Sequence, residues 1–388
     1  MRNEGKPARI LMGPGPSNCD PSVLEAMTRP LLGHLDPEFL AIMDETQELL
    51  RRVMKTRNRL TLPVSGTGSA GMEACFVNLV EPGDRVLVCV NGVFGTRMAD
   101  IVERIGGRLF TVEAEWGKPL DPTAVEAAAR ACLPKVLAVV HAETSTGVLQ
   151  PIEPLGNIAR EVGALFLVDV VTSLGGCNVD TDGWQVDAAY GGTQKCLSCP
   201  PGLAPLSFGS RALSALEARK TKVQSWYLDM TMVRKYWGTE RTYHHTAPIS
   251  MVYALNQALK LLIGEGLEAR FKRHRLNHRA LVAGLEALGL SMLVEAQYRA
   301  PMLNAVLIPE GVDDRKVRGT LLNDYNIEIG GGLGPLAGRT WRIGLMGSSC
   351  RPENVTLLLN VLERILKAHG VPNRSGAAAA AEAVYAAS

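Results

Sequence analysis

The sequence lacks an excess of charge of either sign. It has 41 Lys and Arg residues against 39 Asp and Glu residues, which leaves a formal net charge of +2 over 388 residues. A surface that binds nucleic acid or an anionic membrane normally shows as a clear excess of Lys and Arg. We therefore expect neither nucleic acid nor a membrane as a partner.

Long hydrophobic runs are also absent. No run reaches the roughly 18 residues that a membrane-spanning helix needs, although 46% of the residues are hydrophobic, which is enough for a sizeable core. The first residues show no hydrophobic segment followed by a small-residue cleavage site, and the last five, VYAAS, do not match a peroxisomal signal. We expect a cytoplasmic protein of about two domains.

The eight cysteines do not show the paired spacing of a disulfide framework or a zinc site. Cys196 and Cys199 form a C-x-x-C motif, but a structural zinc needs four ligands and no second cysteine pair has a matching spacing. Others lie inside hydrophobic runs, where cysteine behaves as a small hydrophobic residue, as at Cys75, Cys89 and Cys132. We predict reduced cysteines and no metal.

Short hydrophobic runs alternate with amphipathic segments through the first two thirds of the chain. We predict strands at 60–64, 85–90, 109–112, 136–141, 164–169 and 187–190, and helices at 70–80, 94–105, 121–132 and 152–162. Near-continuous Val, Leu and Ala runs are typical of a parallel sheet that helices cover on both faces. The pattern predicts an α/β fold with a doubly wound, mainly parallel sheet.

The pattern changes near residue 265. A long basic helix is predicted at 267–288, followed by strand-like segments at 305–308 and 341–345. We therefore divide the chain into an N-terminal arm, a large ligand-binding domain, a small C-terminal α+β domain and an Ala-rich tail, at 1–12, 13–265, 266–372 and 373–388. The composition of the tail is consistent with either a frayed helix or disorder.

A glycine motif, GTGSAG at 66–71, follows one predicted strand and precedes a helix. It matches the dinucleotide fingerprint, but that fingerprint needs an acidic residue about 20 positions later, and Asn91 stands there. Backbone N–H groups at a helix N-terminus also bind phosphate, which makes Thr67, Gly68 and Ser69 candidates. From these residues alone, a tight turn without a ligand is equally consistent.

Two charged residues follow predicted buried strands. Asp169 ends the strand at 164–169, where a carboxylate needs a cationic or N–H partner. Lys195 follows the strand at 187–190 and has small residues before it and Pro and Gly after it. A phosphate site, a buried carboxylate and a lone lysine together are typical of pyridoxal 5′-phosphate binding.

Seven segments carry a resemblance to a known family. They are LMGPGPS at 11–17, SGTG at 65–68, HAETSTGVLQ at 141–150, VDVVTSLGG at 168–176, GTQK at 192–195, YHHT at 243–246 and WRIGL at 341–345. In this order they resemble the class V pyridoxal-phosphate-dependent aminotransferases, most closely the alanine–glyoxylate group. The resemblance runs from about residue 10 to residue 368. It implies fold type I of the pyridoxal-phosphate enzymes.

The resemblance implies three catalytic or substrate-binding roles. Lys195 would bind the cofactor as a Schiff base, and Asp169 would keep the pyridine nitrogen protonated. Arg342 would bind the substrate carboxylate through paired hydrogen bonds, next to the backbone of Gly13.

It also implies which residues hold the cofactor. Phe94 would stack on one face of the ring, Val171 would pack on the other, and Thr144 would lie near the ring hydroxyl. The phosphate would bind to Thr67, Gly68, Ser69 and Gln194, and to Tyr243 and Thr246 from the other subunit of a homodimer. Animal members usually have Trp, His and Ser where Phe94, Ser69 and Thr144 stand, so each position keeps a plausible chemistry.

The implied activity is transfer of an amino group from L-alanine to glyoxylate, which gives pyruvate and glycine in two ping-pong half-reactions. Serine–glyoxylate and serine–pyruvate transamination stay open as alternatives. A ureidoglycine–glyoxylate transaminase is less favoured because Asn would be expected where Tyr243 stands. A lyase or desulfurase is less favoured because no cysteine lies on an obvious flexible loop near the cofactor.

Overall fold

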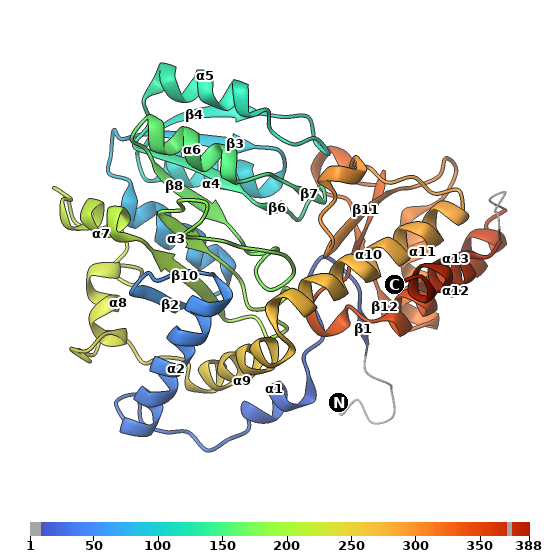
Figure 1. Ribbon diagram of the computed structural model, residues 1–388, viewed down its shortest axis with the longest axis horizontal. Coiled ribbons are helices and arrows are strands. Elements are labelled where there is room, and N and C mark those ends of the chain that lie inside the picture. Colours follow the sequence, from blue (N-terminus) through green and yellow to red (C-terminus); the bar gives the residue numbers. More distant parts are fainter. Residues whose placement is uncertain (1–8, 371–374) are drawn as a thin grey trace.

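The computed structural model describes residues 9–370 and 375–388. At its centre is a seven-stranded sheet in the order β2-β10-β9-β8-β5-β3-β4 (Figure 1). The strands are β2 (Leu60–Ser65), β3 (Arg85–Val90), β4 (Arg108–Glu113), β5 (Val136–Val140), β8 (Leu165–Asp169), β9 (Ala188–Tyr190) and β10 (Leu203–Phe208). Only β10 runs antiparallel to its neighbours in this sheet. The predicted α/β fold with a mainly parallel sheet is confirmed.

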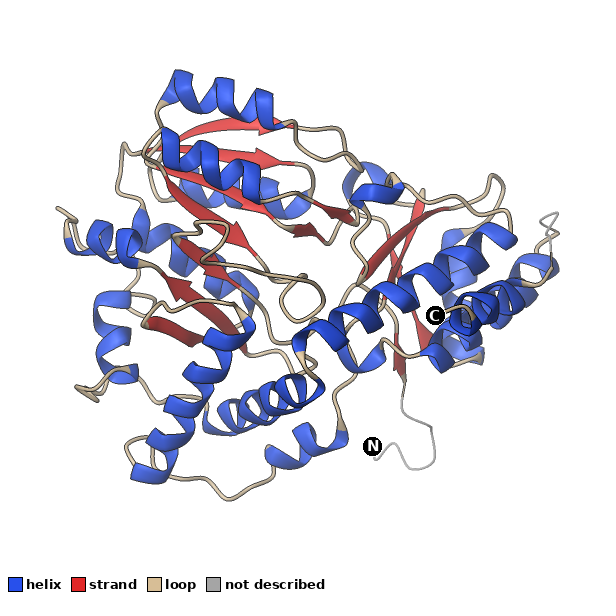
Figure 2. Cartoon of the chain, in the orientation of Figure 1, coloured by secondary structure: helices blue, strands red, loops and turns tan. Residues whose placement is uncertain are grey.

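Helices cover both faces of this sheet (Figure 2). They are α3 (Gly68–Leu79), α4 (Val93–Arg104), α5 (Pro122–Cys132), α6 (Glu153–Glu161) and α7 (Ser210–Glu217). Helices α5 and α6 contact each other on one face, and α3 contacts α4 and α7 on the other. Every residue of β5 and β8 is therefore buried, which explains why these strands have hydrophobic residues at successive positions.

Further helices lie at the lower edge of the sheet in Figure 1. They are α1 (Pro21–Ala26), α2 (Pro37–Val53), α8 (Met230–Trp237) and α9 (Ile249–Glu265). Asp20 and Asp36 cap α1 and α2 by accepting the N–H two residues later, and a proline opens each helix. An Asp-Pro pair at a helix start suits both the unpaired first N–H groups and the fixed φ of proline.

The C-terminal part forms a smaller lobe with its own sheet (Figure 1). Its elements are α10 (Leu267–Ala287), β11 (Leu303–Leu307), α11 (Asp314–Asp324), β12 (Ile327–Glu328), β13 (Gly330–Gly331), β14 (Thr340–Gly344) and α12 (Pro352–Ala368). Strands β11, β14 and β13 are antiparallel, while β12 pairs in parallel with the N-terminal β1 (Ile10–Leu11). The strands β6 (Ala142–Glu143) and β7 (Val148–Leu149) form a separate hairpin. Short 3-10 helices lie at Ala296–Tyr298, Gly334–Leu336 and Gly347–Ser349.

Two large groups of buried hydrophobic residues fill the two lobes. The first extends along the chain from Val23 to Leu262. The second runs from Ala280 to Ala381 and also contains Met12, because β1 crosses to the small lobe. The division near residue 265 stays a prediction.

The Ala-rich tail is a helix, α13 (Ala377–Ala386), in its described part; residues 373 and 374 lie outside the described residues. It packs against α10 and α12, with Ala377 and Ala381 fully buried. Tyr385 Oη donates a hydrogen bond of 2.7 Å to Asn277 Oδ1 in α10. The composition suggested a frayed helix or disorder, whereas the described part of the tail is a packed helix.

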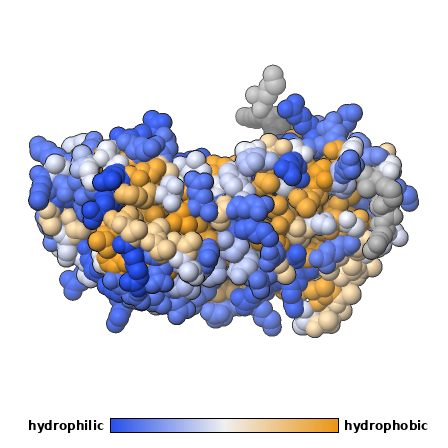
Figure 3. Space-filling model, turned by 90° about the horizontal axis from the view of Figure 1, so that it is seen from above, coloured by the Kyte–Doolittle hydropathy of each residue, from blue (hydrophilic) through white to orange (hydrophobic). Residues whose placement is uncertain are grey.

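Seen from above, the surface is mostly hydrophilic, and hydrophobic residues gather in patches over both lobes (Figure 3). Among the described residues, no helix combines the length and hydrophobicity needed to cross a membrane.

The packing of α13 against α10 and α12 can be tested by a substitution in α10. A Cβ at Gly284 would lie 2.3 Å from Leu359 Cδ1 and 2.9 Å from the Ala377 carbonyl oxygen. We expect Gly284→Ala to lower the free energy of unfolding by about 1–3 kcal/mol, because the added methyl overpacks this crossing. Urea unfolding followed by circular dichroism measures the change.

Gly319→Ala is the matched control. Gly319 lies inside α11, and none of the described neighbouring atoms lies within 4 Å of an added Cβ. Because alanine favours helix, this variant should be neutral or stabilised by up to about 1 kcal/mol. Equal changes in the two variants would contradict the packing of α13.

Candidate active site

The predicted catalytic residues meet beyond the C-terminal ends of the parallel strands. Asp169 is the last residue of β8, and Lys195 lies in the loop after β9. Open α/β sheets bind their ligands at this edge because loops from several strands converge there. The sheet order places β8 and β9 next to each other, so the two residues reach the same space.

Asp169 is a buried carboxylate with two strong hydrogen bonds. Its Oδ1 accepts the Val171 N–H at 2.7 Å, and its Oδ2 accepts the Tyr190 hydroxyl proton at 2.7 Å. Only 2% of its surface is exposed, and this burial raises the pKa of Asp169 to about 7 despite the hydrogen bonds. A cationic ring nitrogen beside it would stabilise the ionised form.

Lys195 is buried under the N-terminal segment. Its Nζ donates a hydrogen bond to the Pro14 carbonyl oxygen, and a Cβ at Gly15, where φ is +105°, would lie within 2.6–2.9 Å of the lysine side chain. Glycine is therefore required here by both its backbone conformation and the lysine's proximity. Burial, with a smaller contribution from the charge of Arg342, lowers the pKa of Lys195 to about 8.

The N-terminus of α3 provides the candidate phosphate site. Thr67 is the N-cap residue in extended conformation, and within the described residues its side chain does not cap the helix. A Cβ at Gly68 would lie 3.1 Å from Val171 Cγ2, so a larger residue would narrow the space between the helix and Val171. The first N–H groups of α3 are thus available for an anion, and the helix dipole favours negative charge there.

Two side chains near this terminus add polar groups. Ser69 Oγ accepts a hydrogen bond of 3.2 Å from Arg97 Nη1, a cation that the sequence analysis did not single out. The Arg97 guanidinium also stacks 4.9 Å from the centre of the Phe94 ring at the start of α4. Gln194 Oε1 is buried and has no hydrogen-bond partner among the described residues, so this oxygen can accept a hydrogen bond from an N–H or O–H donor.

Arg342 projects from β14 of the small lobe towards the same site. Its Nε donates to the Gly331 carbonyl oxygen at 2.7 Å, and its Nη1 donates to the Thr144 carbonyl oxygen at 3.1 Å. It is 7% exposed, and burial lowers its pKa to about 10, so it stays a cation.

Two further predicted residues lie near Arg342. The Thr144 hydroxyl lies 2.5 Å from the Thr172 hydroxyl. Gly344 N–H donates to the Met12 carbonyl oxygen at 2.7 Å, which places Gly13 beside this strand.

Tyr243 and Thr246 lie on the surface of the chain. Tyr243 is 53% exposed, and its hydroxyl lies 3.4 Å from that of Thr246. His245 between them hydrogen-bonds Ser65 Oγ at 2.8 Å, which fixes this loop beside the end of β2. Within the described residues, neither hydroxyl bonds to another predicted site residue, so their role at a second subunit stays a prediction.

Tyr190 and Glu143 also contact the predicted set and were not singled out from the sequence. Tyr190 pairs with Asp169 in the register of β8 and β9 and could have been found, because both residues end neighbouring parallel strands. Glu143 is 1% exposed and accepts the Phe94 N–H at 3.2 Å. Its signal was an acidic residue three positions after the end of a fully hydrophobic strand.

The C-x-x-C motif carries no metal site in the described residues, where no group of His, Cys, Asp and Glu could hold an ion. Cys196 and Cys199 are free and buried, and burial raises the pKa of both thiols. A buried neutral thiol is a poor nucleophile.

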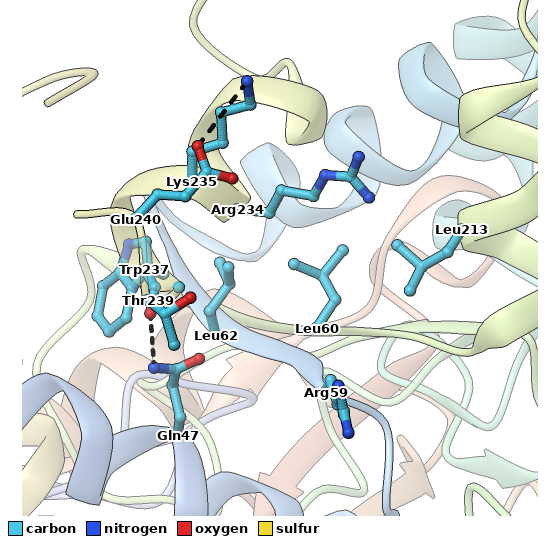
Figure 4. Close-up of a pocket in the computed structure, with 11 residues that line it drawn as sticks. Gln47, Arg59, Leu60, Leu62, Leu213, Arg234, Lys235, Trp237, Thr239 and Glu240 are labelled. Atoms are coloured by element: carbon cyan, nitrogen blue, oxygen red, sulfur yellow. Dashed lines mark hydrogen bonds and ion pairs between the residues drawn. The ribbon is translucent and has the colours of Figure 1, made fainter. Parts of the chain in front are cut away.

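A separate cavity of about 400 Å³ lies at the start of β2 (Figure 4). Leu60, Leu62 and Leu213 form its hydrophobic side, and charged side chains form its rim. Two of the lining cations are in ion pairs, Lys235 with Glu240 at 4.0 Å and Arg234 with Glu217 at 2.9 Å. No predicted site residue lines this cavity, and we assign it no function.

Known proteins share the sequence pattern and the fold of this chain. The family model described as "Aminotransferase class-V" matches residues 11–345. The chain belongs to the class V aminotransferases. The solved ureidoglycine–glyoxylate aminotransferase of Bacillus subtilis is 43% identical, with a TM-score of 0.97 and coverage of 99% of this chain and 100% of that one.

Two further relatives carry another name. The solved alanine–glyoxylate aminotransferase of Nostoc sp. is 52% identical, with a TM-score of 0.93 and coverage of 94% of this chain and 97% of that one. The alanine–glyoxylate aminotransferase of Drosophila melanogaster is 42% identical over 93% of each chain. The predicted family and fold type are therefore confirmed, while the relatives differ in amino donor.

The family depends on pyridoxal phosphate, and the residues of this chain fit that group. A buried lysine and a buried carboxylate follow neighbouring strands, and the uncapped N-terminus of α3 lies against Val171, two residues after Asp169. Lys195 would hold the aldehyde carbon, Asp169 the ring nitrogen, and Thr67, Gly68 and Ser69 the phosphate.

The raised pKa of Asp169 predicts how the cofactor-free protein responds to pH. The folded chain holds a proton on this carboxyl up to about pH 7, whereas the unfolded chain releases it near the ordinary value of 3.8. The free energy of unfolding should therefore fall as the pH rises through this window. We expect Asp169→Asn to remove that loss, since the amide does not titrate.

Chemical denaturation of cofactor-free wild type and Asp169→Asn between pH 4.5 and 8.5 measures this. The stability of the variant relative to wild type should increase across the range by about 1–4 kcal/mol. A constant difference at all pH values would contradict the buried, protonated state of this carboxyl.

Proposed function

We propose that this protein is a pyridoxal-phosphate-dependent transaminase that moves the amino group of L-alanine to glyoxylate, giving pyruvate and glycine in two half-reactions. The observation that carries the proposal is the convergence of buried Lys195, Asp169 and Arg342 from two lobes on one site. The family match and the relatives named for alanine and glyoxylate support it.

Each of these side chains has one task. Bound pyridoxal phosphate supplies an electron sink for removal of the substrate's α-proton. Asp169, as a carboxylate, stabilises a positive charge on the ring nitrogen. Lys195 has a pKa of about 8, well below the ordinary value of 10.5, so roughly a tenth of it is neutral at pH 7 and its Nζ can then accept and return the proton. Arg342 binds the α-carboxylate of the donor and of the oxo acid in turn.

The N-terminal segment favours a small donor. Pro14 and Gly15 lie directly against the Lys195 side chain, so the space next to its amine is narrow. The nearby Arg318 is held by Asp314 through hydrogen bonds of 2.7 and 2.6 Å, which neutralises it as a receptor for a second substrate carboxylate. Alanine and serine both satisfy these limits.

A second candidate is ureidoglycine–glyoxylate transamination, which the Bacillus subtilis relative favours. Tyr243 supports alanine instead, because the resemblance implies Asn at this position in that activity. Elimination or desulfuration is disfavoured because the cysteines next to Lys195 are buried thiols with raised pKa values.

We also propose that the protein is a homodimer with shared sites. Leu31, Trp226 and Tyr243 are 70%, 62% and 53% exposed, which is unusual for such large side chains. A second copy that covers them would bring Tyr243 and Thr246 to the phosphate end of its partner's site.

The half-reactions test the activity directly. We expect L-alanine to convert the visible absorbance band of the holoprotein to the near-ultraviolet band of the aminated cofactor, and glyoxylate to restore it. Lys195→Ala should lose turnover by at least about 10³-fold, since proton transfer lacks its base. A response to serine or (S)-ureidoglycine but not to alanine would retain the class and overturn the donor.

The pKa of Lys195 predicts the pH dependence of cofactor capture. Only the neutral amine attacks the aldehyde, so the rate at which cofactor-free protein binds pyridoxal phosphate should rise with pH and level off above about pH 8. Stopped-flow absorbance between pH 6 and 10 measures this midpoint. A midpoint near 10.5, the ordinary value for lysine, would contradict the buried setting of this side chain.

A further inference from the structure

The N-terminus of α4 is capped by side chains from another part of the chain. Gly92, its N-cap residue, has no side chain to cap it. Ser145 Oγ accepts the Val93 N–H at 3.0 Å, and Glu143 Oε2 accepts the Phe94 N–H at 3.2 Å. Both acceptors come from the β6–β7 hairpin, about 50 residues later in the sequence. We call Glu143, Ser145 and Gly92 the α4 latch.

The latch is tightly built. Glu143 Oε1 accepts the Ser145 N–H at 3.0 Å and its hydroxyl proton at 2.6 Å, which orients both side chains. A Cβ at Gly92 would lie 2.4 Å from Glu143 Cγ and 2.4 Å from Ser145 Oγ. Only glycine lets the helix start this close to the carboxylate, so the contact fixes the position of the first turn of α4.

The carboxylate of the latch is costly to bury. Glu143 is 1% exposed, and burial raises its pKa although it accepts several N–H and O–H groups. For a simple helix cap, a half-buried Asp suffices, as at α1 and α2. The residue that this buried cap holds is Phe94, whose ring the cofactor is expected to stack on.

The Glu143 charge also acts on the three other charged groups of the site, Arg342, Asp169 and Lys195. It raises the pKa of Arg342 and that of Asp169. The groups that face it are thus the backbone N–H groups of α4, Ser145, Asp169, Arg342 and Lys195. The latch joins the β6–β7 hairpin to the helix that carries Phe94.

We propose that Glu143 is a positioning residue for the cofactor, acting through the first turn of α4 to hold the Phe94 ring against the cofactor ring. This inference rests on the proposed cofactor but not on the identity of the amino donor. It assigns a function to an acidic residue that neither contacts the substrate nor donates a proton in the proposed reaction.

Substitution by glutamine tests the latch. In Glu143→Gln, the amide has one acceptor oxygen, and its NH₂ group faces N–H donors that it cannot bond. Hydrogen exchange of the cofactor-free protein, followed by mass spectrometry, should show peptides covering 93–96 exchanging about 10-fold faster or more, with α3 unchanged. Unchanged protection of 93–96 would overturn the proposal, whether or not the protein binds pyridoxal phosphate.

A double-mutant cycle tests the action through Phe94. The dissociation constant of pyridoxal phosphate, measured by quenching of protein fluorescence, should rise about 10-fold in Glu143→Gln and by a similar factor in Phe94→Leu. If Glu143 acts through the ring, adding Glu143→Gln to Phe94→Leu should weaken binding by less than about 2-fold. If the double variant instead shows the product of the two single-variant increases in the dissociation constant, the proposal is overturned.

Asp187→Asn is the matched control for lost stability. Asp187 is also a buried acid, 4% exposed, and it bonds Phe166 N–H and Arg211 at the opposite end of the strands. This variant should lower the melting temperature without changing the dissociation constant. An equal loss of affinity in this variant would attribute the Glu143 effect to general destabilisation and overturn the proposal. A wild type that binds no pyridoxal phosphate would instead overturn the proposed function.

Discussion

The burial of the Asp169 carboxylate at the end of β8 is the constraint on which the site depends. A carboxylate there is unfavourable in the folded chain, and its hydrogen bonds to Val171 and Tyr190 only partly compensate for lost water. A positively charged ring nitrogen would complete the compensation. The same residue that makes the cofactor-free chain less stable therefore makes the cofactor bind, because binding relieves a charge that the fold itself leaves unsatisfied.

The same logic extends to the other charges around this space. Lys195 is shifted towards its neutral form and Arg342 stays a cation, although both are buried. Burial thus prepares one amine to react and one guanidinium to bind an anion. The uncapped start of α3 adds positive potential from its dipole. Every one of these features reduces the stability of the cofactor-free chain and favours a ligand with a phosphate, a ring nitrogen and an aldehyde.

Much of the fold could be predicted because buried parallel strands leave a strong signal. The runs that become β3, β5 and β8 are hydrophobic at successive positions, and Asp169 is conspicuous where one of them ends. Strand β10 was not predicted, since Pro205 interrupts its run, and its place between β2 and β9 is a long-range pairing. Local periodicity holds no information about such a pairing.

The site was predicted unevenly for a related reason. Residues next to glycines in a recognisable motif, such as Lys195 and Gly68, could be found from the sequence. Tyr190 could be linked to Asp169 only by assuming that their two strands are neighbours in the sheet. Glu143 could not be assigned a partner, because its contact depends on a helix that starts about 50 residues away. Likewise, the composition of the tail did not reveal that Ala377 and Ala381 fill a gap against α10. Small residues identify such packing only when the partner helix is known.

Lys195 and Arg342 come from lobes with separate hydrophobic cores, so contacts between the lobes must fix the position of one residue relative to the other. Helix α10 leads from one lobe to the other (Figure 1), and its first turns carry two arginines that are both paired with Glu265. Arg270 donates to the carbonyl oxygen of Cys196, the residue after Lys195, at 2.6 Å. Arg273 donates to the carbonyl oxygen of Gly347, in the loop after the strand of Arg342, at 3.0 Å.

These two arginines connect the loops on either side of the site. Ser348 N–H also donates directly to Ser198 Oγ at 2.7 Å, so the loops touch as well as sharing the arginines. A guanidinium can satisfy several carbonyls at once with fixed geometry, which lysine cannot do. The basic residues of α10 that the sequence shows as a charged helix are therefore partly an internal brace. Through them, Arg342 of the small lobe keeps a defined position relative to the Lys195 amine of the large one.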